Sequence, residues 1–107
     1  MRRGDFVTVA LQGDLGKPRP ALVIQSDLFA DHPSLTLLPV TSDLRDAPLL
    51  RLAVAPLPAN GLRVPSQIMI DKPQSVGRDK IGATIGHLDA AGMVAVNRAI
   101  TVFLGLG

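Results

Sequence analysis

The chain has 107 residues, 47% of them apolar and 19% charged, which excludes a disordered chain and predicts one packed domain over residues 1–107. The absence of cysteine excludes a disulfide framework, a thiolate metal site and a thiol nucleophile. A net charge of +2 predicts weak electrostatic binding to a long nucleic acid, unless a dimer combines the basic surfaces of two copies. Three phenylalanines are the only aromatic residues, which is too few for a surface on which nucleic-acid bases stack. No apolar run approaches the ~18 residues of a membrane span, so we expect a cytoplasmic protein with no membrane partner.

Apolar runs and alternating patterns predict five or six strands along the first four fifths of the chain. These segments are residues 4–11, 20–26, 35–41, 50–54, 64–70 and, as a short sixth, 80–86. Residues 12–18 are expected to form a short loop between the first two strands. Pro39 lies inside the third segment and predicts an edge position or a bulge, because proline has no N–H for the ladder.

The last element is predicted to be a helix that begins after Asp89. Asp89 is a suitable N-cap, and Leu88 and Met93 on either side of it fit a hydrophobic staple. Apolar residues then recur at helical spacing and predict one apolar face: Met93, Val96, Ile100 and Phe103 or Leu104. Gly105 and Gly107 are expected to end the helix. The fold class is therefore mainly β with a C-terminal α-helix, in the form of a small barrel or curled sheet.

Arg19 is the strongest candidate site residue, because prolines bracket it directly before an apolar strand. Pro18 and Pro20 stiffen the backbone and favour extended geometry at the residue before each of them. A guanidinium held at the start of a rigid strand is well placed to bind a phosphate in bidentate fashion. The alternative is a surface arginine in a turn.

The other polar candidates each have a structural alternative. Thr41 and Ser42 place two hydroxyls at a strand end, where loops carry function, but where turns and caps also use hydroxyls. Asp71 and Lys72 follow the fifth strand and are either a functional pair or a solvated ion pair. Two histidines, no glutamate and no cysteine argue against a metal site.

Several motifs taken in order resemble the MazF/PemK family of toxin endoribonucleases. They are Arg3-Gly4-Asp5 before the first strand, Arg19-Pro20-Ala21-Leu22-Val23-Ile24-Gln25-Ser26-Asp27, Pro39-Val40-Thr41-Ser42, Ser66-Gln67-Ile68, and Ile85-Gly86-His87-Leu88-Asp89. The second of these is the specific one, and together they span almost the whole chain. The sequence departs from the family pattern at Ser66, where an acidic residue often precedes the glutamine, and in the short loop of residues 12–18.

The resemblance implies an SH3-like barrel that forms a homodimer and cuts single-stranded RNA without metal or cofactor. The 2′-hydroxyl would attack the neighbouring phosphate and leave a cyclic phosphate and a free 5′-hydroxyl. The family's catalytic residues fall on Arg19 and Thr41, and we expect Lys17, Ser42 and Gln67 to bind RNA. A cognate antitoxin is the implied protein partner, with a disordered tail that covers the RNA groove.

Two other functions remain open on the sequence alone. CcdB-type gyrase poisons share the barrel and the terminal helix but inhibit a topoisomerase and need neither Arg19 nor Thr41. A non-catalytic homologue could keep the same barrel as a binding module, because a motif shows residues and not activity.

Overall fold

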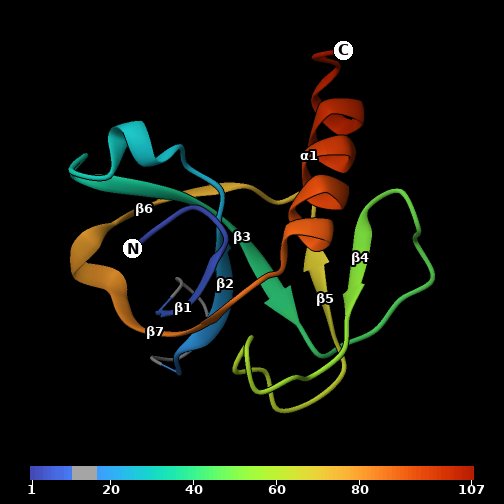
Figure 1. Cartoon of the computed structure of the whole chain (residues 1–107), viewed down its shortest axis with the longest axis horizontal. Helices are drawn as coiled ribbons and strands as arrows, with labels where there is room; N and C mark the ends of the chain where they lie inside the picture. The colour runs from blue at the N-terminus through green and yellow to red at the C-terminus, as the bar shows by residue number, and fades with distance from the viewer. Residues whose placement is uncertain (11–16) are drawn as a thin grey trace.

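The fold is a curled antiparallel sheet with a helix at its C-terminal end (Figure 1). The computed structural model describes residues 1–10 and 17–107, and the elements below lie within those ranges. The strands are β1 (Asp5–Val9), β2 (Arg19–Val23), β3 (Ser34–Thr41), β4 (Arg51–Val54), β5 (Ser66–Met69), β6 (Gln74–Gly77) and β7 (Ile81–His87). The helix α1 spans Ala90–Leu104, and two short 3-10 turns are η1 (Asp27–Phe29) and η2 (Arg78–Lys80).

The predicted fold class is confirmed, but the described residues hold seven strands rather than five or six. The additional strand is β6, which pairs with β3 from Ser34↔Gly77 to Leu37↔Gln74. Its four residues include one buried side chain, Val76, so it lacks the apolar pattern that identifies a strand in the sequence. The predicted loop of residues 12–18 lies mostly outside the described residues.

β3 lies inside the sheet, between β5 and β2, so the predicted edge position of Pro39 is wrong, and the register of β2 with β3 shows no bulge there either. One side of β3 pairs with β2, where Ala21 faces Pro39. The other side pairs with β6 as far as Leu37 and with β5 from Val40 onward. Pro39 lies between these two partners, at a point where the ladder changes strands, and a missing N–H is tolerated there.

Both faces of the unit formed by β1, β2 and β3 carry buried side chains, which explains the continuous apolar run at the end of β2. One core cluster includes Phe6, Leu22 and Leu38, and the other includes Val7, Ala21 and Leu37. Neighbouring residues along each strand point to opposite faces. Each strand of the β1–β2–β3 unit therefore supplies side chains to two cores, as in a sheet that closes on itself.

The helix α1 covers the first of these cores and begins at the predicted residue. The Asp89 side chain accepts a hydrogen bond from the Gly92 amide at 2.7 Å, and Gly105 ends the helix with a φ of 71°. Val96 is fully buried, and Met93 and Ile100 pack against the same cluster. Phe103 remains 44% exposed, because the last turn points away from the sheet (Figure 1). No helix among the described residues is long and apolar enough to span a membrane.

Candidate functional site

A groove of about 960 Å³ opens at one end of the sheet. Its walls come from the start of β2, the end of β3, the segment before β5 and the turn between β5 and β6. Arg19, Thr41 and Ser42 all line it, so three of the five predicted site residues share one surface.

The antiparallel pairing of β2 with β3 brings Arg19 and Thr41 together. Ala21 pairs with Pro39, and two residues further along each strand stand Arg19 at the start of β2 and Thr41 at the end of β3. Arg19 also pairs with Val9 in β1, which fixes its backbone on the other side. The stiff proline-flanked lead-in predicted from the sequence thus becomes the first residues of a strand with partners on both sides.

Thr41 is half-buried, and its hydroxyl already accepts one hydrogen bond. The Asp43 amide donates to Thr41 Oγ1 at 3.0 Å. The hydroxyl proton of Thr41 is therefore available as a donor toward the groove. A donor of this kind next to a guanidinium suits an oxygen that carries negative charge.

The charges in the groove favour an anionic ligand. Among the described residues, three cationic side chains line it, Arg19, Arg63 and Lys72, against one carboxylate, Asp43. Asp43 is already paired with Arg45, with 3.1 Å between Oδ2 and Nη2. The potential of such a groove attracts phosphate groups.

Lys17 and Gln67 do not line the groove. Lys17 is exposed at the edge of the described chain, two residues before Arg19. Gln67 is half-buried, and both of its amide atoms bind the backbone of Arg45. Their predicted roles in RNA binding stay predictions.

The sequence predictions missed Arg63 as a site residue and left Lys72 undecided. Arg63 follows the Asn60-Gly61 turn and Lys72 follows β5, and neither position carries a local signal for ligand binding. Ser66, at the position where the family often has an acid, is buried and donates from Oγ to the Val64 carbonyl at 2.9 Å. It therefore supports the wall of the groove.

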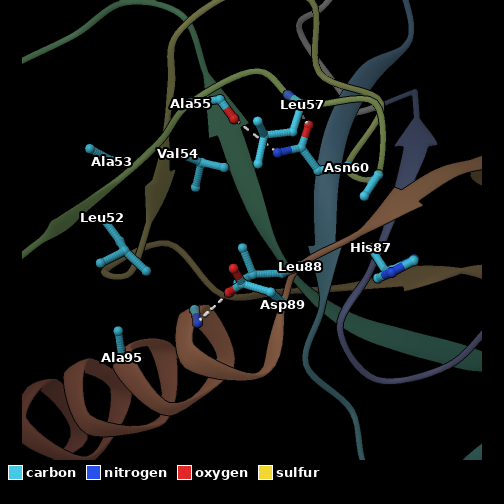
Figure 2. Close-up of a pocket in the computed structure, with 12 residues that line it drawn as sticks. Leu52, Ala53, Val54, Ala55, Leu57, Asn60, His87, Leu88, Asp89 and Ala95 are labelled. Atoms are coloured by element: carbon cyan, nitrogen blue, oxygen red, sulfur yellow. Dashed lines mark hydrogen bonds between the residues drawn. The ribbon is translucent and has the colours of Figure 1, made fainter.

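A second, smaller pocket of about 250 Å³ lies between β4 and the start of α1 (Figure 2). Most of its lining is apolar, including Leu52, Val54 and Leu57. Figure 2 shows that its main polar side chains serve local structure: Asn60 bonds to Ala55 and Leu57, and Asp89 caps α1. In the described residues no three His, Cys, Asp or Glu side chains gather as a metal site.

The fold and the groove define a small antiparallel β protein with a cationic ligand surface. The family described as PemK-like, MazF-like toxin of type II toxin-antitoxin system matches residues 2–104, and the chain belongs to that family. The family predicted from the sequence motifs is thereby confirmed.

Curated and solved relatives agree with this assignment. The chain is 47% identical to the "Probable endoribonuclease MazF" of Mycolicibacterium smegmatis over 99% of its own length and 98% of the relative's. The enzyme class in that relative's name, endoribonuclease, agrees with the class predicted from the sequence. Among solved structures, the Mycobacterium tuberculosis toxin MazF-mt6 matches with a TM-score of 0.83 and 26% identity, over 96% of this chain and 98% of that one. A mycobacterial endoribonuclease in complex with its cognate antitoxin shares the fold, with a TM-score of 0.83 and 21% identity over 100% and 97% of the two chains.

Proposed function

We propose that the chain is the toxin of a type II toxin–antitoxin system and a sequence-specific endoribonuclease that cleaves single-stranded RNA without metal. The observation that carries the proposal is the position of Arg19 and Thr41 at the same end of β2 and β3, in a cationic groove. Membership of the MazF-like family supports the choice of RNA as the anionic ligand.

The chemistry that fits this pair is an attack of the 2′-hydroxyl on the adjacent phosphate. A bond forms between the 2′-oxygen and phosphorus as the 2′-hydroxyl loses its proton to solvent, and the bond from phosphorus to the 5′-oxygen breaks. The leaving oxygen takes up one proton, so the products are a 2′,3′-cyclic phosphate and a 5′-hydroxyl with no net gain or loss of protons. Negative charge grows on the phosphate oxygens during this step, and preorganised donors stabilise it. Arg19 and Thr41 supply such donors.

Arg19 acts first as an electrostatic clamp in this mechanism. An arginine guanidinium stays protonated at neutral pH, so it is a poor general base. Its second role is to donate a proton toward the leaving 5′-oxygen. Thr41 holds the same phosphate through the hydroxyl proton that its bond from Asp43 leaves available.

The proposed protein partners are a second copy of the chain and a cognate antitoxin in the cytoplasm. Self-association is supported by a group of exposed apolar side chains at the C-terminal end of α1 and after it: Val102, Phe103, Leu104 and Leu106. The antitoxin is proposed to cover the groove with a disordered tail. A complex of a mycobacterial endoribonuclease with its cognate antitoxin, on the same fold, supports this partner.

The test is cleavage of a long unstructured RNA in EDTA by the wild-type protein, with Arg19→Ala and Arg98→Ala beside it. Arg98 is an exposed arginine of α1 outside the groove and serves as the matched control. We expect discrete cuts with cyclic phosphate ends for wild type and Arg98→Ala, and a loss of about 10²-fold or more in Arg19→Ala. No cleavage, combined with growth arrest on expression, would favour a gyrase-directed poison instead.

A further inference from the structure

We propose that Arg63 and Lys72 bind backbone phosphates of the RNA on either side of the cleaved one, so that each groove contacts about three phosphates. This inference rests on the proposed function and adds a binding subsite to it. Arg19, Arg63 and Lys72 line one groove but come from three separate parts of the chain: β2, the segment before β5, and the turn after β5. Cations spread in this way match successive phosphates of a strand better than one isolated anion.

Arg63 has no other role in the described structure. It makes no hydrogen bond or ion pair with a described residue and its side chain is exposed. Other arginines are engaged elsewhere: Arg3 binds the Ile24 carbonyl and Asn97, and Arg51 binds the Asp43 carbonyl and Gln67. Arg63 is thus a groove cation with its donors available to a ligand.

The backbone on both sides of Arg63 is anchored. Before it, Leu62 is buried, and its amide donates to Asn60 Oδ1 at 3.0 Å. After it, the buried Ser66 donates to the Val64 carbonyl at 2.9 Å. A short segment held at both ends loses little backbone freedom on binding, which favours its use as a preorganised contact.

Lys72 lines the groove next to a mostly buried carboxylate, Asp71. Lys72 Nζ lies 3.7 Å from Asp71 Oδ2, and the Lys72 amide donates to the Met69 carbonyl at 3.2 Å. The Asp71 side chain is 23% exposed, and its buried Oδ1 accepts no hydrogen bond from the described residues. The Asp71 carboxylate is therefore mostly buried in the turn, whereas the Lys72 side chain beside it is 52% exposed and lines the groove.

The number of phosphate contacts can be read from the salt dependence of binding. Each phosphate neutralised on a single strand contributes about −0.7 to the slope of log K against log salt. Three contacts predict a slope of about −2, whereas a groove that relied on Arg19 alone would give about −0.7. The two alternatives are far enough apart to measure.

The experiment is a titration of the full-length protein with a fluorescein-labelled 12-nucleotide unstructured RNA whose 2′-hydroxyls are all methylated, which prevents cleavage. Anisotropy from 50 to 300 mM KCl gives the Kd and its slope for wild type, Arg63→Ala, Lys72→Ala and the control Arg98→Ala. We expect slopes of about −2 for wild type and Arg98→Ala and about −1.4 for each groove variant, with roughly fivefold weaker binding at 100 mM salt. Arg63→Lys should restore the wild-type slope, because the contact is electrostatic.

The outcomes separate this inference from the function on which it rests. Wild-type binding with an unchanged slope in Arg63→Ala and Lys72→Ala overturns the phosphate subsite and leaves the nuclease proposal intact. A wild-type protein that neither binds this RNA nor cleaves the unmodified long RNA overturns both. Equal weakening in Arg98→Ala would also overturn the subsite, because the effect would then reflect net charge alone.

Discussion

Gln67 binds both backbone polar groups of Arg45. Its Oε1 accepts from the Arg45 amide at 3.0 Å, and its Nε2 donates to the Arg45 carbonyl at 2.9 Å. Arg51 Nη1 donates to the same Oε1 at 3.0 Å and to the Asp43 carbonyl at 3.1 Å. These bonds fix the loop after β3, and that loop carries the Asp43 amide which orients Thr41.

Replacement of Gln67 by alanine should therefore lower the rate of cleavage more than RNA affinity. The side chain of Gln67 makes three hydrogen bonds, two to the loop backbone at Arg45 and one to Arg51, and all three would be lost. The Asp43 amide would then hold Thr41 less firmly, so we expect kcat to fall about tenfold or more with KM nearly unchanged. Steady-state kinetics on a short RNA containing the mapped cut site measures both values. A rise in KM alone would instead support direct RNA binding by Gln67.

Gln25 provides the matched control for this variant. Its side chain likewise makes three hydrogen bonds, all to backbone groups of Phe29, Ser34 and Thr36, and it does not line the groove. Gln25→Ala should lower the Tm about as much as Gln67→Ala and leave kcat unchanged. Equal losses of kcat in the two variants would show that only general stability is being measured.

The elements that the sequence predicted well are those with a local signal. The helix α1 has an N-cap, a periodic apolar face and a terminal glycine within 17 residues, and its start at Asp89 is confirmed. β6 and the central position of β3 depend on pairing between distant segments. Gln74–Gly77 has almost no apolar pattern, and Pro39 is tolerated only because β3 changes partners beside it.

The residues of the candidate site also divide into those with a signal in the sequence and those without one. Arg19 is indicated by the prolines that bracket it, the family resemblance indicates both Arg19 and Thr41, and the register of β2 with β3 explains why the two lie at the same end of these strands. Arg63 and Lys72 reach the groove only through the way the segment before β5 and the turn after it fold over β2 and β3. A single exposed cation in a turn has no pattern of its own, so the sequence could not distinguish these two from a solvated surface charge.

The hydroxyl of Thr41 is expected to be essential for the rate of cleavage. Thr41→Val keeps the shape of the side chain but removes the donor, so kcat should fall about 10²-fold. Thr41→Ser keeps the hydroxyl and should remain within several-fold of wild type. Full activity in Thr41→Val would remove Thr41 from the mechanism.

Ser42→Ala, which removes an exposed hydroxyl of the same groove, should raise KM a few-fold with little change in kcat.

Two glycines with the same backbone conformation offer a test of packing beside the groove. Gly61 and Gly105 both have a φ of 71°, so alanine at either position costs about 1 kcal/mol of backbone strain. A Cβ at Gly61 would also overlap the backbone carbonyl of Ile85, whereas at Gly105 it meets nothing within 4 Å. Thermal unfolding should show a clearly larger loss of Tm for Gly61→Ala than for Gly105→Ala. Equal losses would mean that the segment before β5 can shift away from β7 without cost.

The N-cap of α1 should contribute measurably to stability. Asp89→Ala removes the bond to the Gly92 amide and a negative charge at the positive end of the helix dipole. We expect a loss of about 1 kcal/mol, which corresponds to a fall in Tm of about 4 °C for a domain of this size. Asp46→Ala is the control, because Asp46 is exposed and makes no hydrogen bond or ion pair with a described residue. If both variants unfold at the wild-type temperature, the interactions of Val96 and Ile100 with the core hold the helix without help from its cap.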